Sequence, residues 1–388
     1  MKIFVQGLGA VTPLGRSALE TWEQLCEGRR APRQLMASPL ANRDYYWCPV
    51  PAKFASEAAR QPRLRRSGTV SLLGAAAGFD AFADAGLTPS PGKQARIAVV
   101  FAICSGGVIY TRRLYHEIVT QGANAASPLL FPETVYNAAA SHMAALLGID
   151  AESYTLVGDS AVGLSALHFA AELLLIRPEL DRCLVVGTEE ADWLLADAFA
   201  SWRMATASDS FEVYGRSGGT VFAEAAAAVL IGREGPIRLS GSSAGQSFFS
   251  RRDSVGVAVD FFARFQTNPI SDLIVSSANG TFADDVERQA FSQLFPETPV
   301  YAPKPAVGEA LGASALFQVV VAGLALRHRQ MPGTLDAGFR LPTVNRHTRS
   351  HSGAGALVTS VGFNQQINAV GLEICPERTE EGKAKENH

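Results

Sequence analysis

Short β-branched runs alternate with alanine- and leucine-rich segments along this chain, and this alternation constrains its fold more than any other feature. Strand-like runs at 2–6 and 97–103 alternate with helix-like segments at 68–85 and 138–148. Helices placed between strands in this way pack against the faces of a sheet, so the pattern is typical of a layered α/β protein. We therefore predict a layered α/β fold.

The same pattern starts again after a strand-like run at 220–231 and the Gly235-Pro236 break. The later segments are a strand-like run at 272–276, a helix-like run at 284–294, an apolar stretch at 308–327, and two final strands at 355–362 and 367–372. We predict two similar halves, residues 1–235 and 236–375. Residues 376–388 are charged and lack apolar anchors, so we expect a disordered tail there.

The bulk composition narrows the kinds of partner that this chain binds. Its 388 residues are 47% hydrophobic, which is enough for a large core spread over two or three domain-sized units. The formal charge is only −3, and acidic and basic residues are interspersed. This balance gives no reason to expect nucleic acid or an anionic membrane. We expect small molecules or proteins as partners.

The cysteines and the apolar segments indicate the cellular compartment in which the protein is expected. The five cysteines occur without CxxC pairs, which argues against a structural zinc site and a disulfide framework. We expect reduced thiols and no metal. The N-terminus has neither a basic region nor a long apolar region typical of a signal peptide, and no apolar stretch approaches the roughly 20 residues that span a bilayer. The sequence thus predicts a cytoplasmic protein.

The central segment is the best candidate for a site. A buried-type strand at 184–187 follows an almost wholly apolar helix at 161–176, and Gly158-Asp159-Ser160 stands at the start of that helix. A side chain at this tip lies near exposed backbone N–H groups and the positive end of the helix dipole. A nucleophile at this position would be activated by that field. The alternative is that Asp159 or Ser160 only caps the helix.

Motifs spread over nearly the whole chain occur in the order found in one enzyme family. They are residues 7–15 (GLGAVTPLG) followed by Trp22, Arg65-Arg66 before an alanine-rich helix, 105–107 (SGG), 131–141 (FPETVYNAAAS), 187–190 (GTEE), Glu224, Lys304, and 308–313. In this order they resemble the β-ketoacyl synthases, members of the thiolase-fold condensing enzymes, from residue 1 to about 372. The resemblance implies a thiolase-like fold with two duplicated α/β halves in an α-β-α-β-α layered arrangement.

The resemblance also implies a Cys-His-His active site, and this chain departs from it at each of the three positions. Where the family carries the cysteine of T-A-C, the sequence VGDSAVG has Ser160. The family's A-H-G-T-x-T motif reads ANGTFA and supplies Asn279, and its K-x-x-x-G-H motif reads KPAVGE, with Lys304 retained and Glu309 in place of histidine. The degenerate triad is therefore Ser160, Asn279 and Glu309.

Further departures affect the positions that the resemblance assigns to substrate and gating. Thr281 is retained, but the second threonine of the T-x-T pair, which helps to hold the phosphopantetheine arm, is Ala283. Phe363 remains at the gate, but the glycines of the family's G-F-G-G-T-N loop are replaced in 362–368 (GFNQQIN). Fewer glycines restrict the backbone of a loop that has to swing. Neutral drift after loss of the chemistry would leave the same pattern.

These substitutions remove the groups that decarboxylative condensation requires. A thiol is readily drawn toward its thiolate at a helix N-terminus, whereas a serine hydroxyl is far more basic and needs a positioned base. Asn279 can still donate a hydrogen bond, but an ionised Glu309 offers only acceptors. A carboxylate facing a developing enolate raises the barrier. We therefore expect no condensation by this chain alone.

None of the histidines replaces the missing pair. His168 lies eight residues after Ser160 on one helix, about 12 Å along the axis, which is too far for proton transfer. It precedes Glu172 by one turn, so we expect a packed or paired helix histidine. His142, before another apolar helix, is expected to be structural. The remaining histidines, expected to face solvent, are His116, His328, His347, His351 and His388.

The resemblance is closest to the chain-length factors, which are silent synthase-like subunits that pair with an active ketosynthase in type II polyketide and aryl-polyene pathways. Their central motif E-Q-A-G-G-L-D-A-L is similar to DSAVGLSAL at 159–167. The dimer face expected around 99–110 and 129–135 would shape the partner's acyl tunnel, although these apolar residues are also suited to a core. Two alternatives remain: an acyltransferase with Ser160 as nucleophile and Glu309 as base, and a self-sufficient β-ketoacyl synthase.

The resemblance also implies an acyl carrier protein as partner, with substrates carried on its phosphopantetheine and no cofactor bound to this chain. An arginine cluster, formed by Arg60, Arg63, Arg65 and Arg66, precedes a helix where related synthases dock the acidic carrier. A solvated run of charges fits the same residues.

Overall fold

The computed structural model describes residues 2–88, 96–149, 152–216, 218–266 and 272–375. Two sets of five strands lie in one large mixed sheet. The first set is β1 (Phe4–Val11), β4 (Ile97–Ile103), β5 (Ser153–Val157), β6 (Arg182–Glu189) and β8 (Ala225–Gly232). The second set is β9 (Ile237–Ser242), β11 (Ile274–Val275), β12 (Val300–Tyr301), β15 (Gly355–Val361) and β16 (Gln366–Ile374).

The two sets have the same topology. Numbered by chain order within each set, the strands lie in the spatial order third, second, fourth, fifth, first. In both sets only the fifth strand, β8 or β16, is antiparallel to its neighbours. Strands β1 and β9 pair at Phe4↔Arg238 and Val5↔Ile237, which joins the sets. The predicted boundary at residue 235 falls between β8 and β9.

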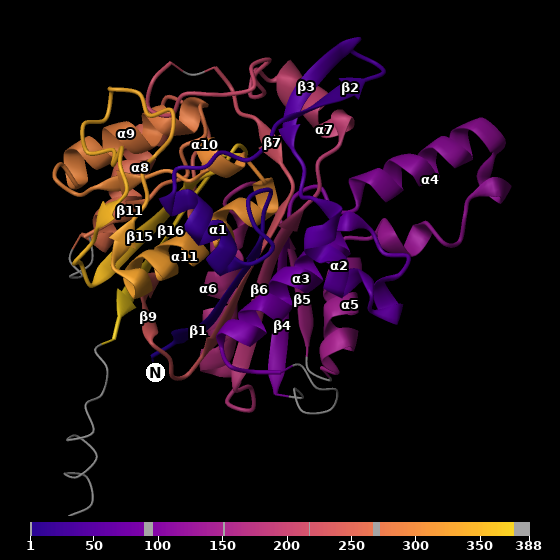
Figure 1. Cartoon of the computed structure of the whole chain (residues 1–388), viewed down its shortest axis with the longest axis horizontal. Coiled ribbons are helices and arrows are strands. Elements are labelled where there is room, and N and C mark those ends of the chain that lie inside the picture. The colour runs from indigo at the N-terminus through magenta and orange to yellow at the C-terminus, as the bar shows by residue number, and fades with distance from the viewer. Residues whose placement is uncertain (1, 89–95, 150–151, 217, 267–271, 376–388) are drawn as a thin grey trace, which may run out of the picture.

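Helices cover both outer faces and fill the space between the two sets (Figure 1). The outer face of the first set carries α3 (Thr69–Asp84) and α5 (Ala138–Leu147), and that of the second carries α8 (Ser254–Phe262) and α9 (Phe282–Leu294). Between the sets lie α6 (Val162–Ile176) and α11 (Leu311–His328). This arrangement is the predicted α-β-α-β-α thiolase-like fold.

The remaining elements lie around these layers. They are α1 (Ala18–Cys26), β2 (Gln34–Ser38), β3 (Arg43–Cys48), η1 (Ala52–Ala55), α2 (Ser56–Ala59), η2 (Pro62–Leu64), α4 (Val108–Gln121), η3 (Ala123–Ala125), η4 (Phe131–Glu133), α7 (Trp193–Ser201), β7 (Phe222–Ala223), β10 (Gln246–Ser247), η5 (Ala263–Phe265), α10 (Lys304–Val307), β13 (Gln330–Met331) and β14 (Arg349–Ser350). Helix α4 extends away from the body of the protein (Figure 1).

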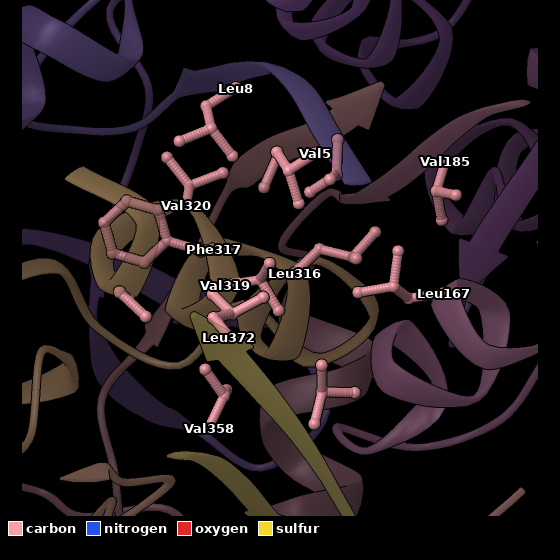
Figure 2. Close-up of a cluster of buried hydrophobic side chains, with 14 of the residues drawn as sticks. Val5, Leu8, Leu167, Val185, Leu316, Phe317, Val319, Val320, Val358 and Leu372 are labelled. Atoms are coloured by element: carbon pink, nitrogen blue, oxygen red, sulfur yellow. The ribbon is translucent and has the colours of Figure 1, made fainter. Parts of the chain in front are cut away.

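The core is centred on α11. Every residue from 311 to 326 is buried, and Leu316, Phe317 and Val320 meet side chains of β1, α6 and the second strand set (Figure 2). The helix has 18 residues and is long and apolar enough, by composition, to cross a membrane, contrary to the expectation from the sequence. However, 89% of that window is buried inside the protein, as expected of a helix that packs between two sheets.

Most predicted elements occur where the sequence places them, with one informative exception. The strand expected at 220–231 is divided into β7 and β8 at Glu224. The backbone N–H of Glu224 donates to Cys48 O, and its carboxylate accepts from Val50 N at 3.0 Å. These contacts with the last residue of β3 and the segment after it take Glu224, which lies between β7 and β8, out of the strand ladder.

The histidines follow the sequence prediction except for His351, which was expected to face solvent. His351 is 7% exposed because it packs beside Asp272 and Gly353, and burial lowers its pKa. His168 is partly buried on α6, and its partner is Ser242 Oγ at 3.0 Å rather than Glu172. His388 and the predicted tail at 376–388 lie outside the described residues. The five cysteines are free thiols.

Candidate functional site

Ser160 lies in the turn between β5 and α6, at the N-terminal tip of the buried central helix. The side chain is completely buried, and its Oγ has no hydrogen-bond partner within the described part of the chain. Its carbonyl oxygen accepts a hydrogen bond from Ser360 Oγ at 3.2 Å. The structure therefore supplies no base in contact with the Ser160 hydroxyl.

Asn279, Lys304 and Glu309 form one buried network. Glu309 Oε2 accepts hydrogen bonds from Lys304 Nζ at 2.7 Å and from Asn279 Nδ2 at 2.8 Å. Glu309 Oε1 accepts from Leu311 N at 2.9 Å and from Ser314 Oγ at 2.6 Å. All four contacts donate to Glu309, and the Lys304 and Glu309 side chains are 2% and 0% exposed. This environment holds Glu309 as a carboxylate in a buried ion pair.

The side-chain amide of Asn279 is hydrogen-bonded on both its nitrogen and its oxygen. Its Nδ2 donates to Glu309, while its Oδ1 accepts from Thr281 Oγ1 at 2.6 Å. Thr281 is the N-cap residue of α9, and its hydroxyl also accepts from Ala283 N. Behind this loop, Asp284 accepts from the backbone N–H groups of Asn279 and Gly280, and burial raises its pKa to about 7. The loop is thus fixed in a conformation that directs Asn279 toward Glu309.

A second buried carboxylate, Glu189, lies beside this network at the end of β6. Its oxygens accept hydrogen bonds from Cys104 N at 2.9 Å, Ser105 N at 3.0 Å and Gly312 N at 3.2 Å. Burial raises the pKa of Glu189 to about 7. Burial and the nearby carboxylate of Glu189 also raise the pKa of the Cys104 thiol, so Cys104 is a poor substitute for the missing nucleophile. Spacing in the sequence did not reveal that Cys104 is near the site.

Glu309 borders a small cavity. A cavity of about 10 Å³ lies among side chains that include Phe222, Glu309 and Leu311, and this volume is close to the smallest that holds one water molecule. Phe363 lies in the loop between β15 and β16, residues 362–365, which we call the gate loop. Its ring contacts Phe199 with centroids 5.2 Å apart. An acyl chain does not fit in the cavity as it stands.

The predicted carrier-docking residues lie on the surface. All four guanidinium groups of the arginine cluster are exposed on the segment from α2 to the start of α3. Arg63 Nε donates to His142 Nδ1 at 3.3 Å, and His142 Nε2 contacts Glu133 Oε1 at 2.7 Å. Burial alone would raise the pKa of Glu133, but hydrogen bonds from His142 and Gly68 N outweigh it and lower that pKa. His142 is structural, as predicted.

The expected dimer face is only partly at the surface. Residues 99–103 belong to β4, which lies between β5 and β6, and they are almost completely buried. That part of the prediction is wrong because β5, not β4, is the edge strand of the set. Leu129, Phe131 and Val135 are 60%, 61% and 40% exposed, so the 129–135 segment does present an apolar surface.

Comparison with known families identifies the chain. Residues 1–235 match the family described as "Beta-ketoacyl synthase, N-terminal domain", and residues 263–337 match "Beta-ketoacyl synthase, C-terminal domain". The chain belongs to the β-ketoacyl synthase family. The family resemblance predicted from the motifs is thereby confirmed.

This β-ketoacyl synthase relative is similar to curated proteins of two kinds. It is 23% identical to 3-oxoacyl-[acyl-carrier-protein] synthase 2 of Coxiella burnetii, over 93% of this chain and 96% of that protein. It is 25% identical to the tetracenomycin polyketide synthase ketoacyl synthase beta subunit of Streptomyces glaucescens, over 88% of this chain and 89% of that protein. Sequence similarity therefore establishes the family but does not separate a condensing enzyme from a beta subunit.

Solved structures show the same fold. A β-ketoacyl synthase from Burkholderia phymatum STM815 superposes with a TM-score of 0.84 at 18% identity, covering 97% of this chain and 100% of that one. The ishigamide ketosynthase/chain length factor gives 0.83 at 18% identity, covering 97% and 99%. A ketosynthase in complex with its chain length factor from Xenorhabdus doucetiae gives 0.79 at 18% identity, covering 96% and 98%.

Proposed function

We propose that this chain is a non-condensing β-ketoacyl synthase-like subunit, a chain-length factor, that pairs with an active ketosynthase in type II polyketide or aryl-polyene biosynthesis. The observation that carries the proposal is the Glu309 carboxylate, which occupies the position of the second histidine and is bound to Lys304 and Asn279. Condensation requires donors that stabilise an enolate as malonyl-carrier protein loses carbon dioxide. Here the centre of the site holds a fixed anion instead.

The surrounding contacts make this arrangement unsuited to condensation in two further ways. One N–H of the Asn279 amide is already bound to Glu309, so at most one N–H of this amide is left to donate to a substrate oxygen. Because Glu309 is in a buried ion pair, moving it aside would leave Lys304 as an uncompensated buried charge, which costs several kcal/mol. The packing as well as the choice of side chains therefore supports a non-condensing role. The contacts of Ser160 also give no support to an acyltransferase that uses Ser160 with Glu309 as its base.

A partner subunit would cover apolar surface that this chain leaves exposed. Strand β5 has β4 on one side only and ends at Val157, which is 52% exposed. On the arm formed by α4 and the returning segment, Tyr115, Val119 and Phe131 are more than half exposed. An edge strand beside exposed apolar side chains is a natural site for association. The Xenorhabdus doucetiae relative is named as a ketosynthase in complex with its chain length factor, which is the association proposed here.

The proposal needs no cofactor on this chain. Substrates would reach the complex in the cytoplasm on the phosphopantetheine of an acyl carrier protein, and the exposed arginine cluster has the charge to attract an acidic carrier. The chain would contribute walls to its partner's acyl tunnel. It would thereby set product length without reacting itself.

The test is co-expression with candidate active ketosynthases from the same genome, followed by sizing and by a malonyl-carrier elongation assay of each chain alone and of the pair. We expect elongation only by a one-to-one complex. Ser160→Ala in this chain should leave elongation unchanged, whereas replacing the partner's catalytic cysteine by alanine should abolish it. Val157→Asp or Val119→Asp should weaken the complex.

Other outcomes would contradict the proposal. Elongation by this chain alone would mean that it condenses without the expected triad. Acyl transfer by the isolated chain that is lost in Ser160→Ala would establish a serine acyltransferase.

A further inference from the structure

The gate loop is fastened to the helix tip that carries Ser160. It makes a tight turn in which Gly362 N donates to Gln366 O at 2.7 Å, and Gln365 has a positive φ of 71°. Residues on both sides of the turn are buried, whereas Asn364 and Gln365 are exposed. The loop therefore lies at the surface with Phe363 as its apolar anchor, and Ser160, next to Asp159 at the helix tip, is completely buried.

Asp159 joins the loop to the helix tip. Its Oδ2 accepts a hydrogen bond from Asn364 N at 2.5 Å, and its Oδ1 accepts from Ala161 N at 3.0 Å. Asp159 is 8% exposed, so the carboxylate is largely withdrawn from water. A hydrogen bond from a backbone N–H to a carboxylate is among the stronger kinds in proteins, because one partner is charged. The contact connects residues 205 positions apart in the chain.

The backbone of the loop is shaped to receive this carboxylate. A Cβ atom added at Gly362 would lie 2.1 Å from Asp159 Oδ2, so the side chain fills the space above that glycine. Burial raises the pKa of Asp159, while the N–H groups of Ala161 and Asn364 and the charge of Lys304 oppose that shift. From the sequence, Asp159 was interpreted only as an alternative cap of the helix. Its hydrogen bond from Asn364 N also links the helix tip to the gate loop.

We propose that Asp159 is a positioning residue that holds the gate loop closed over Ser160 and so denies an acyl-phosphopantetheine arm access to this helix tip. This goes beyond the proposed function, because closure is assigned to one side chain and operates whether or not a partner subunit is bound. In this chain the tip is inaccessible as well as unreactive.

Ser160→Cys in the full-length chain gives a reporter of access. Alkylation of residue 160 by iodoacetamide is followed by mass spectrometry of its peptide, which separates it from the five native cysteines. If the loop must open before the thiol reacts, the rate follows the open population. We expect Asp159→Ala in the Ser160→Cys background to raise the rate about 10- to 100-fold, with a smaller rise for Asp159→Asn.

A control is needed because removing the Asp159 charge also changes ionisation of the neighbouring thiol. The pH dependence of the rate is therefore measured for each variant, and the fitted plateau rates for the fully ionised thiol are compared, so that a change in thiol pKa does not enter the comparison. Gln365→Asn is the matched loop variant, because it shortens the side chain that donates to Phe249 O and leaves Asp159 intact. It should change the plateau rate little.

Hydrogen exchange of the 361–366 segment, in chains that retain Ser160, gives a second measure that needs no reporter. Asp159→Asn should accelerate exchange in this segment and leave the exchange rates of strand β6 unchanged. Equal plateau rates with and without Asp159, together with unchanged exchange of the gate loop, would overturn the proposal. A shift in the apparent thiol pKa with equal plateaus would also overturn it, because Asp159 would then act only on the charge at residue 160.

Discussion

Lys304→Met tests whether Glu309 is held as a carboxylate. The substitution keeps a side chain of similar length but removes the ammonium that lies 2.7 Å from Glu309 Oε2, in a site that is closed to solvent. Removing one partner of a buried ion pair costs about 3–5 kcal/mol. Three donors, from Asn279, Leu311 and Ser314, remain on the carboxylate, so we expect the low end of this range.

The expected shift in melting temperature follows from the size of the chain. For 388 residues, an unfolding entropy of roughly 0.8 kcal/mol/K converts 3–5 kcal/mol into a decrease of about 4–6 °C in Tm. Thermal unfolding followed by circular dichroism measures it. The control is Lys2→Met, which removes an exposed lysine and should leave Tm unchanged.

A double-mutant cycle separates the ion pair from other effects of Lys304. If the two charges interact, Lys304→Met combined with Glu309→Gln should destabilise the protein by about 1–3 kcal/mol less than the sum of the single variants. If Lys304→Met melts within about 1 °C of the wild type, Glu309 is neutral in the folded protein, and no buried anion opposes condensation at this site.

Three other predictions follow from single features of the structure. Burial raises the pKa of Glu190 from the usual 4.5 to about 8, so the folded state holds this proton more tightly than the unfolded chain and stability falls as pH rises through that window. Between pH 5 and 8, the free energy of unfolding measured with urea should fall by about 4 kcal/mol less in Glu190→Gln than in the wild type. An equal fall in both proteins would contradict this prediction. Gly308→Ala should lower the free energy of unfolding by about 2–4 kcal/mol, because φ is 92° and the added Cβ would lie 2.7 Å from Ala223 Cβ. Gly256→Ala, where an added Cβ meets nothing within 4 Å, is its control. Charge reversal of the arginine cluster should weaken carrier binding and reduce its salt dependence in calorimetry at two ionic strengths; unchanged binding would exclude docking there.

The motifs predicted the degenerate triad, and the structure brings two of its members, Asn279 and Glu309, into contact. Ser160, Asn279 and Glu309 were identified from short motifs that keep their order and spacing. The pairing of Glu309 with Lys304 and Asn279 was not predicted, although Lys304 lies only five residues away. Motif spacing defines which residues share a site, whereas hydrogen-bond partners depend on where loops from different strands meet.

Two predictions of exposed residues failed because segments distant in the sequence cover those residues. The apolar run at 99–103 was assigned to a dimer face, but β5 pairs along the free side of β4 and buries it. His351 was placed in solvent because its neighbours in sequence are polar, but it packs against Asp272 and Gly353. A strand or a single histidine has the same local sequence whether another segment covers it or not.

The layered α/β class and its repetition in two halves follow from local periodicity in the sequence, and the departures from the family's Cys-His-His motifs follow from residue identity. Three features became visible only in the folded structure: the ion pair of Glu309 with Lys304, the position of Cys104 beside the site, and the hydrogen bond from the gate loop to Asp159. Each of these depends on contacts between segments that are brought together only by the packing of two strand sets around α6 and α11, and such contacts leave no periodic trace in the sequence.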